Sequence, residues 1–256
     1  DQKTLTEREA SKIFDKYFAV FPWNELPPDA RGFDMGCGTG RWAKFVLPRV
    51  GELHCIDPSA AIHVAKENLI DFKNVKFIDG SVDDPKLEKK SQDFGYSLGV
   101  LHHLPDTEKA IQSCVRLLKP GAPFLLYLYY ALENRPNWFK AIWTLSNILR
   151  LLIIKLPFRI RLIVTNLIAF FVYLPFAKLA QLLNFLNIDS ANLPLNEYRD
   201  TSFYTMMTDA RDRFGTPLEK RFTKDEIEEM MKSAGLENII FSEQPPYWCA
   251  LGRRAD

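Results

Sequence analysis

Short apolar runs alternate with helix-like stretches over the first half of the chain. The runs lie within residues 51–59, 75–84, 92–106 and 119–130, and an earlier one leads into residue 33. Each is bounded by Gly, Pro, Asp or Ser, as expected for short buried strands. Strands that alternate with helices in this way predict a parallel sheet covered by helices on both faces.

The C-terminal part predicts a different local pattern. Thr223 followed by Glu226 is typical of a capping box that opens a helix, and Gly235 is placed to end that helix. Residues 237–244 and 247–253, separated by Pro245 and Pro246, form two strand-like runs. They are close enough in sequence to pair as an antiparallel hairpin.

A glycine-rich turn, FDMGCGTGR, follows the first apolar run. It contains Gly36, Gly38 and Gly40, and Asp57 follows about one strand–helix–strand unit later. Glycines let the backbone turn tightly beside a nucleotide-type ligand, and a later carboxylate can accept the ribose hydroxyls. A dinucleotide fingerprint needs a small residue where this chain has Arg41, so a dehydrogenase is the weakest alternative.

With Asp34 in front of it, this turn resembles the first motif of class I S-adenosylmethionine-dependent methyltransferases, acid-x-G-x-G-x-G. The likeness continues in order and spacing over residues 33–130, and more loosely from Phe222 to the end. It implies an α/β fold, a Rossmann-like, seven-stranded, mostly parallel sheet with helices on both faces and a reversed edge strand. It also implies S-adenosylmethionine as cofactor, S-adenosylhomocysteine as product, and a cofactor lying over the carboxyl ends of the first four strands.

The resemblance also assigns roles to residues. The glycines contact the methionine portion, Asp57 holds the ribose, and Asp34 either orders the loop and reaches the ligand's amino group through water or only caps local amides. The adenine edge falls at Ser81 and Val82, with Asp79 or Asp83 as substitutes, and Leu98 and Gly99 line the wall. The implied cofactor-binding positions are Asp34, Gly36, Cys37, Gly38, Gly40, Trp42, Asp57, Pro58, Ser81, Val82, Leu98 and Gly99.

Methyl transfer from a sulfonium depends on positioning, and needs a base only when the acceptor must lose a proton. Candidates for catalysis are His103, Tyr129 and Tyr130, and His102 is an alternative base, although a histidine at such a turn is often structural. Candidate substrate contacts come from the aromatic N-terminal stretch, the histidine turn and the polar segment 197–216; they are Tyr17, His102, Tyr198, Arg199 and Tyr204. Each of these is also explained by packing or by surface ion pairs.

Composition adds little. The chain has 256 residues, 47% of them hydrophobic, and a net charge of +1, which gives no general attraction to nucleic acid. The four cysteines are scattered without metal-ligand spacing, so we expect reduced thiols, no metal site and a cytoplasmic protein, and the charged N-terminal stretch is not expected to be a secretory signal.

Residues 134–216 are predicted to form a helical insertion, or cap, between the parts 1–133 and 217–256 of the cofactor-binding domain. Within 134–188 there are no acidic residues and seven basic ones: Arg135, Lys140, Arg150, Lys155, Arg159, Arg161 and Lys178. Sixteen uncharged residues, 162–177, are fewer than the roughly 20 that a spanning helix needs, and Asn166 and Pro175 are expected to interrupt them. The segment is therefore not expected to cross a membrane.

Two interpretations of 134–188 stay open. In one, its apolar faces pack on each other, on the catalytic domain or across a homodimer, and Lys178, Gln181, Asn184 and Asn187 form one solvated stripe on a mostly buried helix. In the other, its cationic, aromatic-rich surface rests peripherally on an anionic membrane. The predicted function is methyl transfer to oxygen or nitrogen, less readily carbon, of a small-molecule acceptor. The alternatives are a lipid or quinone-like acceptor, or a non-catalytic sensor or scaffold.

Overall fold

The computed structural model describes residues 7–190, 193–216 and 218–256. The chain divides into two compact units. Among the described residues, one unit, the sheet unit, comprises residues 10–131 and 220–256; the other, the helical unit, comprises residues 132–219 together with residues 7–9.

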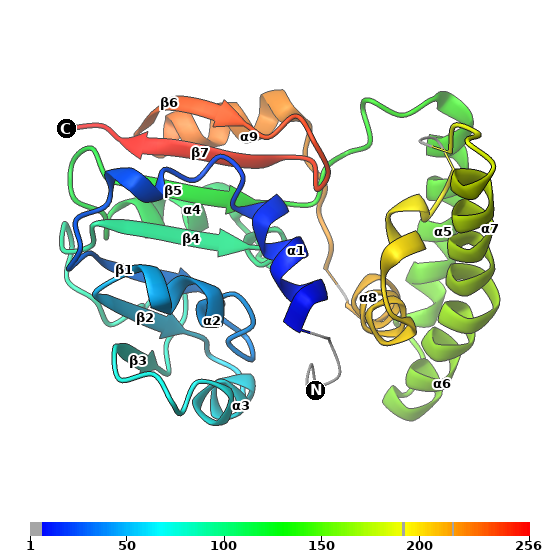
Figure 1. Ribbon diagram of the computed structural model, residues 1–256, viewed down its shortest axis with the longest axis horizontal. Coiled ribbons are helices and arrows are strands. Elements are labelled where there is room, and N and C mark those ends of the chain that lie inside the picture. Colours follow the sequence, from blue (N-terminus) through cyan, green and yellow to red (C-terminus); the bar gives the residue numbers. More distant parts are fainter. Residues whose placement is uncertain (1–6, 191–192, 217) are drawn as a thin grey trace. The chain divides into compact units, whose positions relative to one another are not determined.

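The sheet unit contains one seven-stranded sheet in the order β3-β2-β1-β4-β5-β7-β6 (Figure 1). The strands are β1 (Arg31–Met35), β2 (Glu52–Ile56), β3 (Val75–Ile78), β4 (Phe94–Leu98), β5 (Pro123–Tyr127), β6 (Leu236–Phe241) and β7 (Cys249–Arg254). Strands β1 to β5 pair in parallel, and β7 runs antiparallel to both β5 and β6. The predicted seven-stranded, mostly parallel α/β sheet is confirmed.

The position expected for the reversed strand is wrong. The reversed strand β7 lies inside the sheet, between β5 and β6, and β6 forms the edge. Burial agrees with this order: the first four residues of β7 are all buried, whereas in β6 only Leu236 is buried and the other residues are exposed or partly buried. A strand with a neighbour on each side is covered along both edges, and an edge strand is not.

Helices cover both faces of this sheet. They are α1 (Glu7–Tyr17), η1 (Trp23–Glu25), α2 (Ala43–Val46), η2 (Leu47–Arg49), α3 (Ala61–Asn68), η3 (Leu101–His103), α4 (Thr107–Val115) and α9 (Lys224–Ser233). The predicted capping box at α9 is confirmed, because Thr223 and Glu226 each bond the other's backbone amide. Gly235, with φ of +87°, follows its C-terminal end, as the left-handed conformation there requires.

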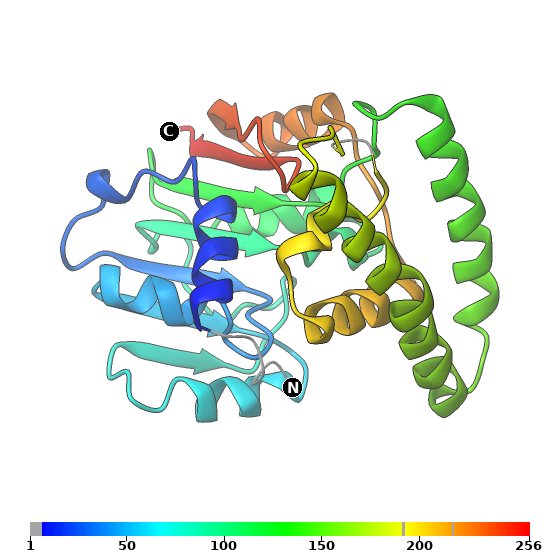
Figure 2. The same cartoon turned by 45° about the vertical axis from the view of Figure 1, so that its right-hand side comes forward.

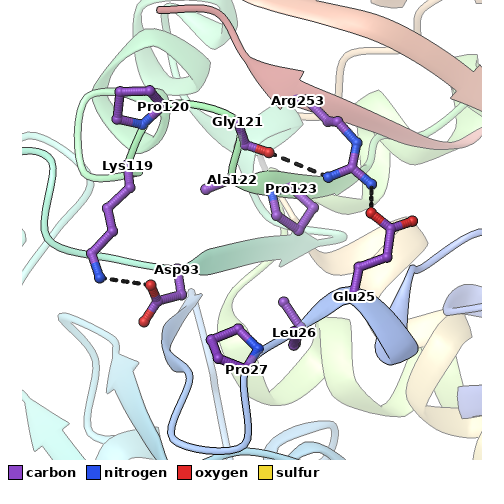
Figure 3. Close-up of a pocket in the computed structure, with 10 residues that line it drawn as sticks. All are labelled: Glu25, Leu26, Pro27, Asp93, Lys119, Pro120, Gly121, Ala122, Pro123 and Arg253. Atoms are coloured by element: carbon purple, nitrogen blue, oxygen red, sulfur yellow. Dashed lines mark hydrogen bonds and ion pairs between the residues drawn. The ribbon is translucent and has the colours of Figure 1, made fainter.

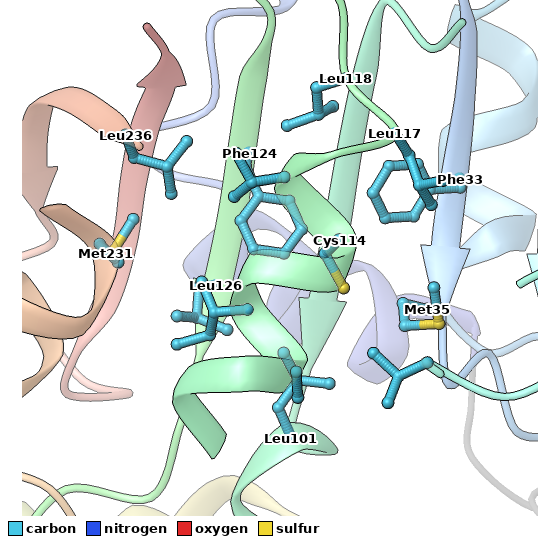
Figure 4. Packing of buried hydrophobic residues seen from close by; sticks show 14 of the residues in the cluster. Phe33, Met35, Leu101, Cys114, Leu117, Leu118, Phe124, Leu126, Met231 and Leu236 are labelled. Carbon is cyan, nitrogen blue, oxygen red and sulfur yellow. The ribbon is translucent and has the colours of Figure 1, made fainter. Parts of the chain in front are cut away.

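Strand alternation creates two cores. Phe33 and Met35 of β1 pack with Cys114 of α4 and Met231 of α9 on one face (Figure 4). Tyr96 of β4 and the α1 and α2 side chains pack on the other face. Because successive side chains of a strand point to opposite faces, each buried strand serves both cores.

The helical unit consists of α5 (Asn137–Ile153), α6 (Phe158–Ile168), the π-helical turn η4 (Ala169–Tyr173), α7 (Leu174–Phe185), η5 (Asn196–Asp200) and α8 (Phe203–Gly215). The elements α6, η4 and α7 join as one continuous helix (Figures 1 and 2). Its small core joins Ala169, Tyr173 and Ala177 to Met206 and Phe214 of α8.

The predicted interruption of this helix is wrong. Asn166 and Pro175 both lie within an unbroken helical run, Phe158–Phe185, of 28 residues. Asn166 accepts a hydrogen bond from Arg211 Nε at 2.9 Å, and the wider π-helical turn just before Pro175 accommodates the proline ring.

Little of this helix is buried within the described chain. By length and composition the run could cross a membrane: its mean hydropathy is 1.9, and only 22% of that window is buried. Large apolar side chains such as Ile163 and Phe171 are exposed, so this chain alone does not bury the helix. Packing of its apolar side across a homodimer stays a prediction.

Two glycines fix the spacing of β1 and β4 through neighbouring aromatic rings. Phe33 pairs with Gly95, and Gly32 pairs with Phe94. A Cβ added at Gly95 would lie 2.3 Å from the Phe33 ring, and one at Gly32 would lie 2.2 Å from the Phe94 ring. Each ring therefore occupies the space that a side chain on the next strand would need.

We expect Gly95→Ala to destabilise the sheet unit by about 1–3 kcal/mol, because the Phe33 ring has to leave its buried position. Thermal unfolding measures this as a lower Tm. Gly215→Ala is the matched control, since a Cβ there meets nothing within 4 Å. Equal Tm values for the two variants would contradict the packing argument.

Candidate cofactor site and acceptor-side cluster

The candidate site begins where the sheet order changes direction. Strand β1 has β2 on one side and β4 on the other, and all three run in parallel. The glycine turn follows β1, and Gly99 follows β4. The carboxyl edge of a parallel sheet at such a switch point is where ligands bind in open α/β folds.

The glycines of the turn meet different surroundings. Gly36, Gly38 and Gly40 all have positive φ, of +82°, +53° and +78°. A Cβ at Gly36 would lie 2.5 Å from Val100, and one at Gly40 would lie 2.8 Å from Leu69, so these two glycines permit close packing. A Cβ at Gly38 would meet nothing within 4 Å. Its backbone therefore faces open space.

Asp57 links the glycine turn to the end of β2. One carboxylate oxygen accepts the Gly38 amide at 2.8 Å. The other accepts the Ser59 amide at 2.9 Å and the Ser59 hydroxyl at 2.5 Å. A carboxylate has about four lone-pair sites, so acceptor capacity remains for a ligand hydroxyl.

Asp34 faces its neighbouring strand. It is buried, and its carboxylate accepts the Tyr96 hydroxyl at 3.0 Å across the β1–β4 pair. Burial raises its pKa to about 7, the Tyr96 hydrogen bond lowers it in part, and the nearby charge of Asp57 raises it. A buried acid of this kind would be ionised more readily by a cationic group bound beside it.

The other predicted cofactor residues also lie at the carboxyl edge. Trp42 packs on Tyr17, with ring centroids 5.1 Å apart, and Ser81 closes a turn with Asp84 through backbone bonds of 3.2 and 3.1 Å. Leu98 ends β4. The remaining ones are a buried Cys37, an exposed Pro58 directly after Asp57, and a buried Val82.

The groups at this edge are of the kinds that S-adenosylmethionine needs. A Cβ at Gly99, which has φ of +76°, would also meet nothing within 4 Å, so the turns after two neighbouring strands each contain a glycine that faces open space. The amides near Gly38, the carboxylates of Asp57 and Asp34, and the Leu98–Gly99 wall are the groups that would hold the cofactor. When bound, it supplies a methyl group on a sulfonium leaving group.

A cluster of histidine, tyrosine and arginine lies next to Gly99. His102 stacks on Tyr129 with centroids 3.9 Å apart and contacts His103 at 4.0 Å. The guanidinium of Arg221 lies 5.3 Å from the Tyr129 ring centroid and donates to the Tyr130 carbonyl at 3.2 Å. Tyr130 itself packs on Tyr247, so Tyr129 is the tyrosine that meets the histidines.

His102 is buried, and neither of its ring nitrogens has a hydrogen-bond partner among the described residues. Burial, His103 and Arg221 together lower its pKa to about 2. Such an imidazole stays neutral at physiological pH and is too weak a base to hold an acceptor's proton. It can instead orient a polar acceptor by a hydrogen bond.

The predicted substrate residues fall into both units. Tyr17 packs edge-on against Tyr127 at 4.9 Å in the sheet unit. In the helical unit, Tyr198 packs on Tyr173 at 5.0 Å, Arg199 pairs with Asp200 at 3.2 Å, and Tyr204 is half-buried in α8. Their contact with substrate stays a prediction.

Sequence reasoning missed three residues of this region. Tyr96 could have been found, because strand register places it opposite Asp34. Ser59 could also have been found as a local partner of Asp57, two residues away. Arg221 has no local signal, since it is distant in sequence from Tyr129 and meets it only through the fold.

A separate cavity of about 210 Å³ lies at the opposite edge of the sheet (Figure 3). Its lining includes Lys119, which pairs with Asp93 at 2.6 Å, and Arg253, which pairs with Glu25. None of the predicted site residues lines it. Because these cations are already paired, the cavity offers little to an anionic ligand.

We expect Asp57→Ala to weaken S-adenosylhomocysteine binding about 10- to 100-fold, since hydrogen bonds to a charged group contribute about 1.5–3 kcal/mol. Isothermal titration calorimetry measures the change. The matched control is Asp71→Ala, which removes an exposed acid from the same unit. Unchanged affinity in the Asp57 variant would place the ribose elsewhere.

The raised pKa of Asp34 predicts that the stability of the fold depends on pH. Unfolded, it loses its proton near its ordinary pKa of 3.8, whereas folded it keeps the proton up to about pH 7. Its contribution to stability therefore falls as pH rises through this window and then levels off. We expect Asp34→Asn to raise Tm relative to the wild type more at about pH 8 than at about pH 5. The control Asp71→Asn should change Tm by the same amount at both pH values. The same behaviour in the Asp34 variant would contradict the prediction.

Comparison with known proteins identifies a methyltransferase domain in this chain. Residues 33–126 match the family described as "Methyltransferase domain". The chain is 30% identical over 112 residues to phosphoethanolamine N-methyltransferase 2 of Caenorhabditis elegans, covering 42% of this chain and 25% of that protein. It is 32% identical over 124 residues to a ubiquinone biosynthesis O-methyltransferase of Nitrosomonas europaea, covering 46% of this chain and 51% of that protein.

The fold has solved relatives as well. A SAM-dependent methyltransferase of Thermotoga maritima superposes with a TM-score of 0.50 at 14% identity, covering 96% of this chain and 91% of that one. The chain spans from a quarter to about half the length of the curated relatives named above. Fold, glycine turn and family match agree that residues 33–126 form a methyltransferase domain of the class I S-adenosylmethionine-dependent type, whose cofactor is S-adenosylmethionine.

Proposed function

We propose that this chain transfers a methyl group from S-adenosylmethionine to an oxygen or nitrogen atom of a small-molecule acceptor. The observation that carries this proposal is the position of the His102–Tyr129 stack directly after Gly99, beside the open space at the carboxyl edge. A polar cluster next to a cofactor site is where an acceptor would be oriented.

The cluster favours a polar acceptor atom. The neutral His102 ring can donate from one nitrogen and accept at the other, and the nearby Arg221 adds a fixed positive charge. Two relatives are named as an N-methyltransferase and an O-methyltransferase, which supports the same two acceptor atoms here. Carbon acceptors are less favoured, because no residue of the cluster marks a carbon-acid site.

We assign selection of the acceptor to the helical unit, with Tyr198, Arg199 and Tyr204 as its polar contacts. A second candidate acceptor is a lipid-like molecule. The observation that favours it is that the exposed large apolar side chains of the described residues belong, apart from Ile70 and Ile240, to this unit.

A screen with radiolabelled S-adenosylmethionine tests the proposal. We expect label to be transferred to a polar or a lipid fraction of a cell extract, and thermal stabilisation by S-adenosylhomocysteine but not by NAD. Stabilisation without transfer to any fraction would favour a non-catalytic sensor or scaffold. Stabilisation by NAD alone would end the methyltransferase proposal.

His102 provides a residue-level test. We expect His102→Phe, which keeps an aromatic ring against Tyr129 but removes both nitrogens, to lower kcat roughly tenfold or more, the equivalent of about one hydrogen bond in the transition state. Its thermal shift with S-adenosylhomocysteine should persist. The matched control is His63→Phe, at an exposed position of α3. An unchanged kcat in the His102 variant would make that ring purely structural.

A further inference from the structure

The outward face of α5 is a continuous apolar stripe. It consists of Trp138, Ile142, Leu145, Leu149 and Leu152, all at least half exposed. Their spacing of four, three, four and three residues places them on one side of the helix. An isolated exposed leucine is ordinary, but a stripe along a whole helix marks an interaction surface.

The long helix Phe158–Phe185 carries a second apolar face. Ile163 is 59% exposed, Phe171 67% and Phe185 81%. The other large apolar residues exposed along it are Phe158, Ile160, Leu167, Phe170, Val172, Leu179 and Leu182. The two faces together make the helical unit apolar on its outside.

The packed side of the long helix has the opposite composition. Its buried positions are Thr165, Ala169, Tyr173, Ala177 and Ala180, which recur every three or four residues. Apart from Tyr173, these buried positions are small residues, while most of the bulky aliphatic and aromatic ones face outward. In water the hydrophobic effect sorts side chains the other way, whereas small residues at helix contacts are typical of helices surrounded by lipid.

Two arginines of the helical unit are largely buried and bonded within it. Arg150 is 5% exposed and donates to the Thr216 carbonyl at 2.9 Å. Arg213 pairs with the buried Glu219 at 2.5 Å, at side-chain exposures of 13% and 1%. Arg150 and Arg213 are therefore bonded within the unit, while many of its large apolar side chains are exposed.

The basic residues near these apolar faces indicate which partner would cover them. Residues 134–188 contain no acid, and Lys155 and Arg159 are exposed where α5 connects to α6, as is Lys178 in α7. A second copy of the chain packed symmetrically on this surface would bring like charges together. Anionic lipid headgroups complement the same charges, at about 1 kcal/mol for each basic residue near the surface.

We propose that the helical unit docks on an anionic lipid bilayer, with the outward faces of α5 and of Phe158–Phe185 inserted into its apolar layer. Lys155, Arg159 and Lys178 then lie at headgroup level, and the paired charges of Arg150, Arg213 and Glu219 stay within the unit. This inference concerns where the protein works, and it stands apart from the identity of the methyl acceptor.

Flotation of the full chain tests the proposal, using vesicles of phosphatidylcholine with and without phosphatidylglycerol. We expect flotation with the mixed vesicles, and weaker flotation with the neutral ones. The double variant Leu145→Glu, Phe171→Glu should lower the floated fraction at least tenfold. The matched control is Ile70→Glu, Ile240→Glu, which adds the same charge at exposed apolar positions of the sheet unit and should float like the wild type.

Each variant is first shown to be folded by its thermal shift with S-adenosylhomocysteine, so that failure of docking is separate from failure of the cofactor site. Absence of flotation, or equal flotation of the two double variants, would overturn the proposal. The proposal would also be overturned if the protein bound no vesicles and formed a soluble dimer that is lost only in the Leu145, Phe171 double variant. That result would assign the two faces to contact with a second copy of the chain.

Discussion

The hydrogen bond from the Gly38 amide to Asp57 is the constraint on which the cofactor site depends. It joins the turn after β1 to the end of β2 at 2.8 Å, and its donor Gly38 has a positive φ of +53°. A side chain at Gly36 or Gly40 would push the turn off Val100 or Leu69. Packing at Gly36 and Gly40 and the Asp57 carboxylate thus hold the turn in place. The side of Gly38 that faces open space stays accessible to a ligand.

The cluster around His102 is arranged by burial rather than by charge pairing. His102 is enclosed by Tyr129, His103 and the nearby Arg221, and this enclosure lowers its pKa and keeps the ring neutral. A neutral ring can orient an acceptor, but it is a poor proton acceptor. This agrees with a reaction in which positioning does most of the work, since the sulfonium leaving group already favours transfer.

The two units obey different rules of packing. In the sheet unit the bulky residues Phe33, Phe94 and Phe124 are fully buried, as expected for a core formed in water. In the helical unit the buried positions of the long helix are small apart from Tyr173, which packs with Met206 and Phe214, and many bulky residues are exposed. One chain therefore combines a domain that folds by burying its apolar residues with a unit many of whose apolar residues lack such burial within the described chain.

Local pattern by itself determined the glycine turn, the strands, the capping box at Thr223 and the family, because each depends on residues close together in sequence. The sequence did not determine that β7 lies inside the sheet, nor that Arg221 lies over Tyr129, since both depend on distant partners. It also misjudged the helix around Asn166 and Pro175, whose continuity depends on a π-helical turn and on Arg211. The periodicity of a sequence locates an apolar face of a helix. Only the tertiary structure decides whether that face is buried, because burial depends on which other elements pack against it.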